Sequence, residues 1–511
     1  MTDPASPTSA ADPQGQARRG ISAHDTGFFG HPRGLSTLFF TEMWERFSYY
    51  GMRALLLLYM TAPIAAGGLG FDTARGGAIY GLYTSMVYMM TLPGGWIADR
   101  LIGQRRAVLY GGILIACGHF SMAFPSITTF YMGLFLIVVG TGLLKGNVSV
   151  IVGQLYAPGD VRRDAGFSIF YMGINIGAFA APIVCGYLGQ RINWHYGFAG
   201  AGFGMVIGLV QYVWGSRYLG EAGLRPAPSA PEAHARLRKQ AILWGWIALA
   251  VIVLFGIGAY AGVIPVSATQ ISDAAGVFLL ILTVGFFGWL FFGGDWTPEE
   301  RKRLYAIGVL FLAAALFWSV FEQAGSTLNL FADRNTRNEL LGWPFPSSWF
   351  QSLNSLFIFA LAPVFAFLWV RLGATGREPS SPAKFAIGLV FVGAGFAVLI
   401  VAAQLAEQGV QVSPLWLTAT YLLHTIGELC LSPVGLSAMT KLAPLRIGGL
   451  MMGVWFLASS VGNYMGGRVA AFYESFALPT LFGVVAAFAI VAGLIMFALV
   501  PPIKRMMGKV N

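Results

Sequence analysis

Charged residues are scarce in this sequence, since Asp, Glu, Lys and Arg make up only 11% of its 511 residues. Soluble domains contain roughly 25% charged residues, so a water-soluble fold is excluded. The hydrophobic residues make up 56% of the chain and form blocks of about 20 residues, the length that crosses roughly 30 Å of hydrocarbon. Alternation with period 2 is absent and the blocks are too long for barrel strands. Each block is therefore predicted to be a membrane-spanning helix.

The sequence also has little of what an enzyme or a metal protein needs. The three cysteines and the histidines inside apolar blocks match no disulfide framework or paired metal-ligand spacing, and we expect them to be structural. These residues are Cys117, Cys185, Cys430, His119, His195 and His424. A G-x-x-x-x-G-K-[ST] motif is absent, which argues against an ATP-driven pump within this polypeptide. With no convincing nucleophile and base, the sequence predicts no enzyme and no cofactor other than protons.

The apolar blocks predict about fourteen spanning helices, and an even number places both termini on one side of the membrane. Of the 32 Lys and Arg residues, 24 lie in the tails and the loops on that side, five in the opposite loops and three inside helices. The positive-inside rule therefore predicts cytoplasmic termini in a multi-pass protein of the inner cell membrane. This topology explains the net charge of +10 better than nucleic-acid binding does. The predicted spans are residues 35–62, 74–99, 105–124, 128–156, 164–190, 194–218, 240–262, 275–293, 303–331, 346–371, 383–404, 413–441, 447–472 and 478–500.

Composition shifts divide the chain into two halves and an insertion. The Pro/Ala run RPAPSAPEA and the basic cluster Arg301 to Arg303 flank one pair of helices. Without this pair, six helices remain on each side, as in transporters built from two bundles around a central cavity. We expect the pair, which has no internal charge, to be a peripheral, lipid-facing insertion without a role in transport. The predicted parts are a disordered cytoplasmic tail (1–33), an N-terminal six-helix bundle (34–220), a cytoplasmic linker with the inserted pair (221–300), a C-terminal six-helix bundle (301–503) and a second cytoplasmic tail (504–511).

Seven ionisable residues lie deep within the predicted helices. At about 3 kcal/mol each, isolated placement in the membrane would cost on the order of 20 kcal/mol, so they are expected to share a hydrated, mutually compensating cavity. Four carboxylates against three cations leave one acid unpaired. That acid is a candidate proton carrier, because a buried carboxylate without a cation is stabilised by binding a proton. The seven residues are Glu42, Glu45, Arg46, Arg53, Lys145, Glu322 and Glu428.

The segment EMWERFSYYGMR at 42–53 is the strongest local pattern. Its polar residues recur at offsets of three, four, seven, eight and eleven, which places them in one stripe on a helix. One interpretation is a set of ion pairs within the helix, such as Glu42 with Arg46, that only stabilises packing. The other is a functional stripe, which we favour because charges inside a membrane are usually functional.

Several motifs in this chain resemble those of one family. The stripe E-x-x-E-R-F-x-Y-Y-G is similar to the first-helix motif of the proton-dependent oligopeptide transporters, a family of the major facilitator superfamily. The matching motifs are spread over nearly the whole chain and occur in the same order as in the family. The extra helix pair also resembles that of bacterial members. The further motifs are GTGLLKGNVS at 140–149, FSIFYMGINIGAFAAP at 167–182, WSVFEQAGSTLN at 318–329 and GELCLSPVGLS at 427–437.

This resemblance implies roles for individual residues. Glu42, Glu45, Arg46, Lys145 and Glu322 match the proton-coupling positions, and Glu322 is expected to pair with Arg53 when the site is empty. Arg53 and Lys145 resemble a cationic pole for a peptide carboxylate, and Glu428 resembles a pole for the α-amino group. The asparagines are candidates for peptide contacts, although asparagines also link membrane helices. The remaining substrate-binding candidates are Tyr49, Tyr50, Tyr88, Asn175, Trp318, Asn354 and Trp455.

The sequence GGWIADRLIGQRR at 94–106 resembles the gating loop of the major facilitator superfamily. Asp99 and Arg100 are the gate residues that this resemblance implies, with Asp99 and the following arginines capping helix ends and forming a charge network. The alternative is a positive-inside anchor and nothing more. We favour the gate because an aspartate and glycines accompany the basic residues.

The pattern as a whole predicts a proton-coupled symporter that imports di- and tripeptides by alternating access and functions as a monomer in the lipid bilayer. A cavity with cations in one half and a carboxylate in the other suits a zwitterion. Nitrate, an amino acid or a drug-like peptide mimic remains an alternative substrate. An ion channel is less favoured, since repeated pore rings would be expected.

Overall fold

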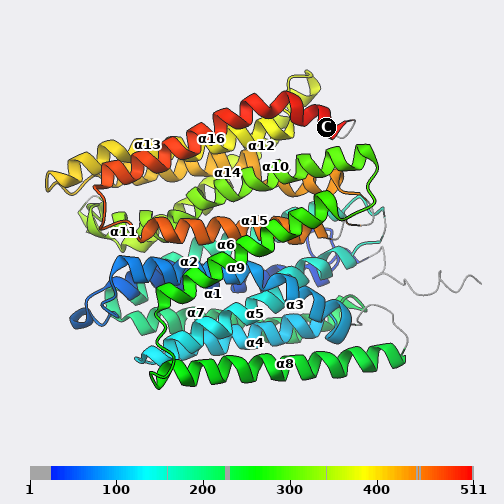
Figure 1. Ribbon diagram of the computed structural model, residues 1–511, viewed down its shortest axis with the longest axis horizontal. Coiled ribbons are helices and arrows are strands. Elements are labelled where there is room, and N and C mark those ends of the chain that lie inside the picture. The colour runs from blue at the N-terminus through cyan, green and yellow to red at the C-terminus, as the bar shows by residue number, and fades with distance from the viewer. Residues whose placement is uncertain are drawn as a thin grey trace, which may run out of the picture.

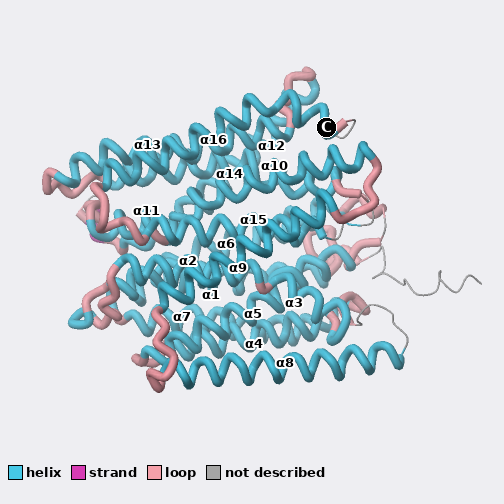
Figure 2. Tube along the Cα trace, in the orientation of Figure 1, coloured by secondary structure: helices cyan, strands magenta, loops and turns pink. Residues whose placement is uncertain are grey.

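The computed structural model describes residues 25–157, 159–224, 231–340, 342–444, 447 and 450–508. These residues form a bundle of long helices (Figure 1) joined by short loops (Figure 2). A small antiparallel hairpin pairs β1 (Glu339–Leu340) with β2 (Trp343–Pro344). The helices are α1 (Gly34–Thr61), α2 (Thr73–Met89), α3 (Thr91–Ile97), α4 (Gln104–Met122), α5 (Ile127–Gln154), α6 (Arg163–Tyr187), α7 (Trp194–Gly215), α8 (Pro231–Tyr260), α9 (Ala268–Phe292), α10 (Pro298–Phe321), α11 (Thr327–Arg334), α12 (Ser352–Ala374), α13 (Ser381–Glu407), α14 (Pro414–Leu442), α15 (Leu450–Ala470) and α16 (Leu478–Met507).

Each of the fourteen predicted spans corresponds to one helix or to two consecutive helices. The span at 74–99 is divided between α2 and α3, and the span at 303–331 is divided between α10 and α11. Among the described residues, nine helical stretches are long and apolar enough to cross a membrane. The predicted all-helical membrane fold is therefore confirmed. α1 is not among the nine, because it carries four charged residues at its centre.

Three helices begin earlier than their apolar blocks predict. α8 begins at Pro231, so the basic residues Arg236, Arg238 and Lys239 lie on a helix and not in a linker. α9 and α10 begin at capping boxes, formed by Ser267 with Gln270 and by Thr297 with Glu300. A capping side chain bonds backbone N–H groups that the first turn would leave unpaired. Prediction from apolar blocks misses such polar first turns.

The N-terminal helices α1 to α7 and the C-terminal helices α10 to α16 form two neighbouring groups (Figure 1). α9 crosses the molecule between them, and α8 lies along the outer edge of the N-terminal group. We call the end of the molecule where α1 ends and α2 begins the distal end. Helices approach closely where glycines face each other: a Cβ on Gly467 of α15 would lie 2.2 Å from the Cα of Gly81 in α2. Small residues allow this contact between membrane helices.

The predicted disordered tail, residues 1–33, is ordered in part: residues 25–33 have a defined structure. Residues 1–24 lie outside the described residues. A bridge between Phe28 and His31 folds this segment back on itself. The His31 side chain is buried and its Nδ1 lies 2.9 Å from the hydroxyl of Tyr156. Arg162 also donates hydrogen bonds to the carbonyls of Asp25 and Gly30. The segment is thereby docked on the loop between α5 and α6. The second predicted tail is helical up to Met507, and 509–511 lie outside the described residues.

The docked segment is expected to loosen on acidification. Burial, followed by the nearby Arg162 guanidinium, lowers the pKa of His31, while Asp160 opposes this shift. The docked state then binds the proton less readily than the undocked state, so its stability falls as pH drops through the usual histidine value of about 6.5. Hydrogen exchange of residues 25–33, corrected for the intrinsic pH effect, should therefore speed up at about pH 5.5. His31→Gln should abolish this pH dependence, and equal acid sensitivity in both proteins would contradict the role of His31.

Candidate functional site

The charged stripe of α1 is buried at the centre of the molecule. The Nε of Arg46 lies 3.1 Å from Oε1 of Glu42, one turn earlier, and also contacts Oε2 of Glu45. The three residues are exposed by 3% or less. The arginine is thus shared between two carboxylates, which leaves one negative charge on this cluster when both are ionised. The helical periodicity of the sequence predicts this common face.

A second ion pair joins the two halves of the protein. The Nη2 of Arg53 in α1 lies 2.7 Å from Oε2 of Glu322, at the end of α10. The Nε of Arg53 donates a 2.8 Å hydrogen bond to the hydroxyl of Tyr80 in α2. Both charged side chains are buried, so their mutual compensation is essential in a medium that solvates neither. The predicted pairing of Glu322 with Arg53 is present in this structure.

Lys145 of α5 is held by aromatic rings. Its Nζ lies 3.6 Å from the ring centroid of Tyr88 and about 6 Å from those of Tyr49 and Phe456. Within the described part of the chain, no carboxylate forms a salt bridge with it. The ammonium is still close enough to Glu45 and Arg46 for an electrostatic interaction. Cation–π contacts stabilise a desolvated ammonium without fixing it to one anion, so Lys145 is available to a new anionic partner.

A cavity of about 150 Å³ lies between the two halves. Residues of α1, α2 and α6 line one side, and residues of α10, α12 and α14 line the other. The structure thus brings together candidates that are separated by hundreds of residues in the sequence. The predicted residues in its lining are Tyr50, Arg53, Tyr88, Asn175, Trp318, Glu322, Asn354 and Glu428.

The carboxylate of Glu428 is oriented by an amide. Asn354 Nδ2 of α12 donates a 2.9 Å hydrogen bond to Oε2 of Glu428 in α14 and lies 3.1 Å from the hydroxyl oxygen of Thr425. Glu428 has no cation within salt-bridge distance among the described residues. Across the cavity, Asn175 Nδ2 bonds the carbonyl of Tyr171 one turn earlier. Its amide oxygen remains available as an acceptor.

Three of the substrate-binding candidates do not line the cavity. Tyr49 is 2% exposed and packs edge to face with Tyr50, whose ring does reach the cavity. Lys145 is covered by Tyr88, and Trp455 packs edge to face with Trp318. Tyr49 and Tyr50 are consecutive on α1 and point in different directions, so only Tyr50 reaches the space. Lys145 and Trp455 are each separated from it by an aromatic side chain of another helix. Tyr49, Lys145 and Trp455 thus contact residues of the cavity lining without lining the cavity themselves.

Several lining residues were missed in the sequence. Tyr171, Gln351, Tyr421, His424 and Ser432 all line the cavity. Each lies three, four or seven residues from Asn175, Asn354 or Glu428, on the same helical face. The helical faces of Asn175, Asn354 and Glu428, followed for one or two turns, lead to these residues. The expectation that His424 is purely structural is also incomplete, since its ring packs on Phe396 and Phe321 beside the cavity.

Comparisons with known proteins match this architecture. The model of the POT family (PTR2) matches residues 105–485. The chain belongs to the POT family. It is 43% identical to the peptide transporter YePEPT of Yersinia enterocolitica over 494 residues, covering 94% of this chain and 96% of the relative. It is 37% identical to a di-/tripeptide transporter of Lactococcus lactis, covering 95% and 98%.

A solved structure supports the same assignment. The crystal structure of a peptide transporter POT in complex with sulfate superposes with a TM-score of 0.88 at 45% identity, covering 94% of this chain and 97% of that chain. The predictions of a peptide transporter of this family, of its fold and of a protein that is not an enzyme are therefore confirmed. This POT family transporter is a multi-pass membrane protein.

The predicted gate loop differs from expectation in its contacts. Asp99 and Arg100 are exposed on a π-helical turn, Ala98–Ile102, and Asp99 accepts a 2.7 Å hydrogen bond from Gln104. Arg105 instead donates to the carbonyls of Gly220 and Ala222 after α7. The ion pairs of the described residues include none between Asp99 and an arginine. The described residues therefore do not show the expected charge network: Asp99 is bonded by Gln104, and Arg105 is bonded to backbone oxygens.

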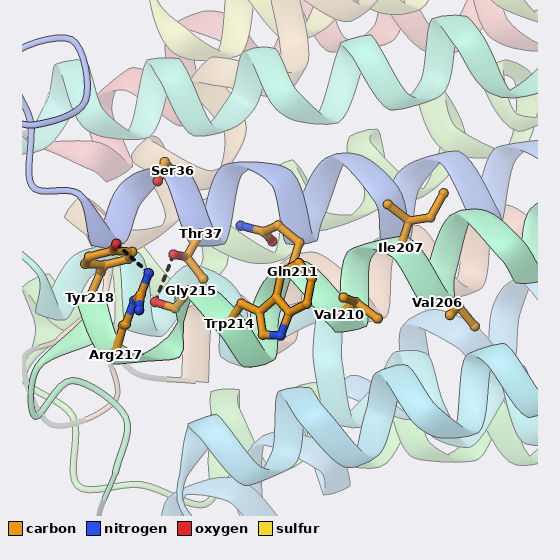
Figure 3. Close-up of a pocket in the computed structure, with 10 residues that line it drawn as sticks. All are labelled: Ser36, Thr37, Val206, Ile207, Val210, Gln211, Trp214, Gly215, Arg217 and Tyr218. Carbon is orange, nitrogen blue, oxygen red and sulfur yellow. Dashed lines mark hydrogen bonds between the residues drawn. The ribbon is translucent and has the colours of Figure 1, made fainter.

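A second, larger cavity of about 460 Å³ is less suited to a charged solute. It lies between the first turn of α1 and the end of α7 (Figure 3). Its walls are mainly apolar, with Val206, Ile207, Val210 and Trp214, and Arg217 is its one charged residue. Arg217 bonds the hydroxyl of Tyr218 at one end of this groove. Its lining residues include no carboxylate, so the groove does not offer the pair of opposite charges that a zwitterion needs.

The Arg53–Glu322 pair is expected to behave as a unit. Glu322→Gln leaves the Arg53 charge buried without its partner, and Arg53→Met does the same to Glu322, each at a cost of about 3–5 kcal/mol. The double variant should lose less stability than the sum of the two. Thermal unfolding of the four purified proteins measures this coupling. Glu474→Gln, which breaks the exposed pair with Arg334, is the control and should cost at most about 1 kcal/mol. Additive effects of the two buried substitutions would contradict the coupling.

Proposed function

We propose that this transporter imports di- and tripeptides together with protons by alternating access. The observation that carries the proposal is the cavity between the two halves, with the guanidinium of Arg53 contributed by α1 and the carboxylate of Glu428 contributed by α14. Relatives named as peptide and di-/tripeptide transporters, aligned over nearly their whole length, support the same substrate class.

The two charges suit the two ends of a short peptide. A zwitterionic peptide carries a carboxylate and an ammonium separated by its backbone, and Arg53 and Glu428 offer the complementary charges. Asn175 and Asn354 can donate to and accept from the peptide backbone regardless of its side chains. Aromatic walls that include Tyr50 and Trp318 accept varied side chains at low entropic cost. A simple anion such as nitrate would leave Glu428 without a partner.

The proton-coupling unit in this proposal is the cluster of Glu42, Glu45 and Arg46 with Lys145, supplemented by Glu322. When Glu45 is ionised, it holds Arg46 and attracts Lys145. Protonation of Glu45 releases these cations toward the peptide carboxylate. Glu322 has a similar role at Arg53: it forms the salt bridge with Arg53 when no peptide is bound, and its protonation frees the guanidinium. One anion thereby replaces another, so that no buried cation is left uncompensated.

The driving force is sufficient for concentrative uptake. One proton moving down about 150 mV supplies roughly 3.5 kcal/mol, enough for on the order of several hundredfold accumulation. The positive-inside distribution of Lys and Arg supports an orientation with both termini in the cytoplasm of a bacterial cell, in its inner membrane. The distal end then faces outward. A complete set of candidate binding residues within this one chain supports a transporter that works as a monomer.

Glu45→Gln mimics a permanently protonated Glu45. We expect this variant to bind peptide and to exchange internal for external peptide, while losing accumulation driven by a pH gradient. Paired measurements of exchange and gradient-driven uptake in proteoliposomes, on protein of verified fold, test this. Normal gradient-driven accumulation would remove Glu45 from the coupling unit. Parallel loss of all transport modes would instead indicate a packing ion pair.

Glu428→Gln keeps the shape and the hydrogen bond from Asn354 but removes the charge that attracts an α-ammonium group. Affinity for free dipeptides should fall by at least tenfold, or about 1.4 kcal/mol. N-acetylated dipeptides should bind weakly to both proteins, so the substitution should change their affinity little. Competition against a labelled dipeptide gives both values. Unchanged affinity for free peptides would show that Glu428 is not the amine site.

A further inference from the structure

One residue of the inserted helix pair contacts both halves of the transporter at the distal end. The hydroxyl of Ser272 in α9 donates a 3.2 Å hydrogen bond to the carbonyl of Ala78 in α2. The carbonyl of the same residue accepts a 3.0 Å hydrogen bond from the hydroxyl of Tyr464 in α15. Ser272 is fully buried. α9 is thereby bonded to an N-terminal helix and to a C-terminal helix through a single position.

Two further contacts join α9 to α15. Oδ1 of Asp273 lies 2.9 Å from Nη1 of Arg468 in a partly exposed salt bridge. One turn along α9, Gly276 fits closely against the ring of Tyr464: a Cβ at this position would lie 2.2 Å from the tyrosine hydroxyl. Tyr464 therefore packs on the surface of α9 as well as bonding it. The salt bridge adds little because water screens it, so the buried contacts of Ser272 and Tyr464 carry most of the attachment.

α2 and α15 are themselves in direct contact at this place. A Cβ on Gly77 would lie 2.8 Å from both the carbonyl oxygen of Gly467 and the amide nitrogen of Ala471. Deeper in the membrane, the hydroxyls of Ser85 and Ser460 lie 2.8 Å apart. The two halves are closed against each other here, with no room for a solute to pass between α2 and α15.

These contacts revise the prediction for the inserted pair. α8 does resemble a lipid-facing insertion, because it lies at the edge of the molecule (Figure 1). Its apolar side chains, such as Trp244, Trp246 and Leu254, are exposed. α9 does not resemble such an insertion, because it lies over the line where the two halves meet. A helix that only faced lipid would not be expected to bond a backbone carbonyl of one half and a tyrosine hydroxyl of the other.

We propose that α9 is a clamp that stabilises the conformation closed at the distal end. Alternating access, on which this inference rests, requires α2 and α15 to separate at that end. Ser272 can reach Ala78 and Tyr464 together only while they remain adjacent. Every transition to the distally open state therefore breaks at least one side of the clamp, and the contacts of α9 shift the conformational equilibrium toward the closed state. Ser272 and Tyr464 act here as positioning residues that do not touch the solute.

The test measures the distance between the two halves at the distal end. Spin labels at Ser126→Cys, in the loop between α4 and α5, and at Gln408→Cys, after α13, report on the two groups from exposed positions. The native exposed cysteine is removed by Cys117→Ser. The Ser272→Ala, Tyr464→Phe double variant deletes both hydroxyls of the clamp. Thr283→Val is the matched control, since its hydroxyl bonds only a carbonyl of its own helix.

In lipid nanodiscs without peptide, the double variant should show a larger population of long distances between the labels. Each lost hydrogen bond should change the ratio of closed to open states by on the order of 2- to 10-fold. Thr283→Val should match the parent protein. Tyr464→Phe alone removes one of the two hydrogen bonds, so it should shift the ratio in the same direction by a smaller factor, and it serves as the decisive variant if the double variant does not fold. Asp273→Asn, at the exposed salt bridge, should shift the ratio least.

A distance distribution in the clamp variants identical to that of the Thr283→Val control would overturn the clamp. The distances are measured without substrate, so this result is independent of whether peptides are the solute. Uptake provides a separate readout: a larger distally open population should lower KM for external peptide, because the fraction of competent transporter rises. A lowered KM for another solute, with the same change in distance, would support the clamp while contradicting the proposed substrate.

Discussion

The need to compensate buried charges is the constraint on which this structure depends. Four carboxylates and three cations lie inside helices that otherwise could not hold them, since each isolated charge costs several kcal/mol in a membrane. The structure meets this cost in two ways. Arg46 is shared by Glu42 and Glu45 within one helix, whereas Arg53 and Glu322 compensate each other across the interface of the two halves.

The Arg53–Glu322 pair links the compensation of charge to the relative position of the two halves. The ion pair joins Arg53 of α1 to Glu322 directly after α10, and in the proposed mechanism it holds the halves together until a peptide carboxylate replaces Glu322. Lys145 differs from both arginines because aromatic rings surround it and no described carboxylate forms a salt bridge with it. Glu428 has an amide partner, Asn354, in place of a cation. Among the described residues, Lys145 and Glu428 are thus a cation and a carboxylate inside the helices without a salt bridge, which suits the proposed binding of a zwitterionic solute.

The closed distal end shows a different use of polar contacts. Gly77, Gly81 and Gly467 allow α2 and α15 to touch, and α9 adds hydrogen bonds that join each of them to a third helix. Hydrogen bonds between membrane helices are individually weak, at about 0.6 kcal/mol on average. A closure built from several of them can be stable and still open on the timescale of transport.

The sequence by itself determined the membrane class, the approximate positions of the long helices and the polar stripe of α1, because helix length, hydrophobicity and helical periodicity are local properties of the chain. The resemblance of its motifs also identified Arg53, Glu322, Asn354 and Glu428, which the structure brings to one cavity. Only the tertiary structure decided that Tyr49, Lys145 and Trp455 stand behind the lining, and that Tyr171 and Gln351 reach it. It also decided that Asp99 pairs with Gln104 and that α9 bridges the two halves. The reason is physical: hydropathy shows that a residue is inside the membrane, but which neighbour it faces depends on the rotation and packing of helices that are distant in the sequence.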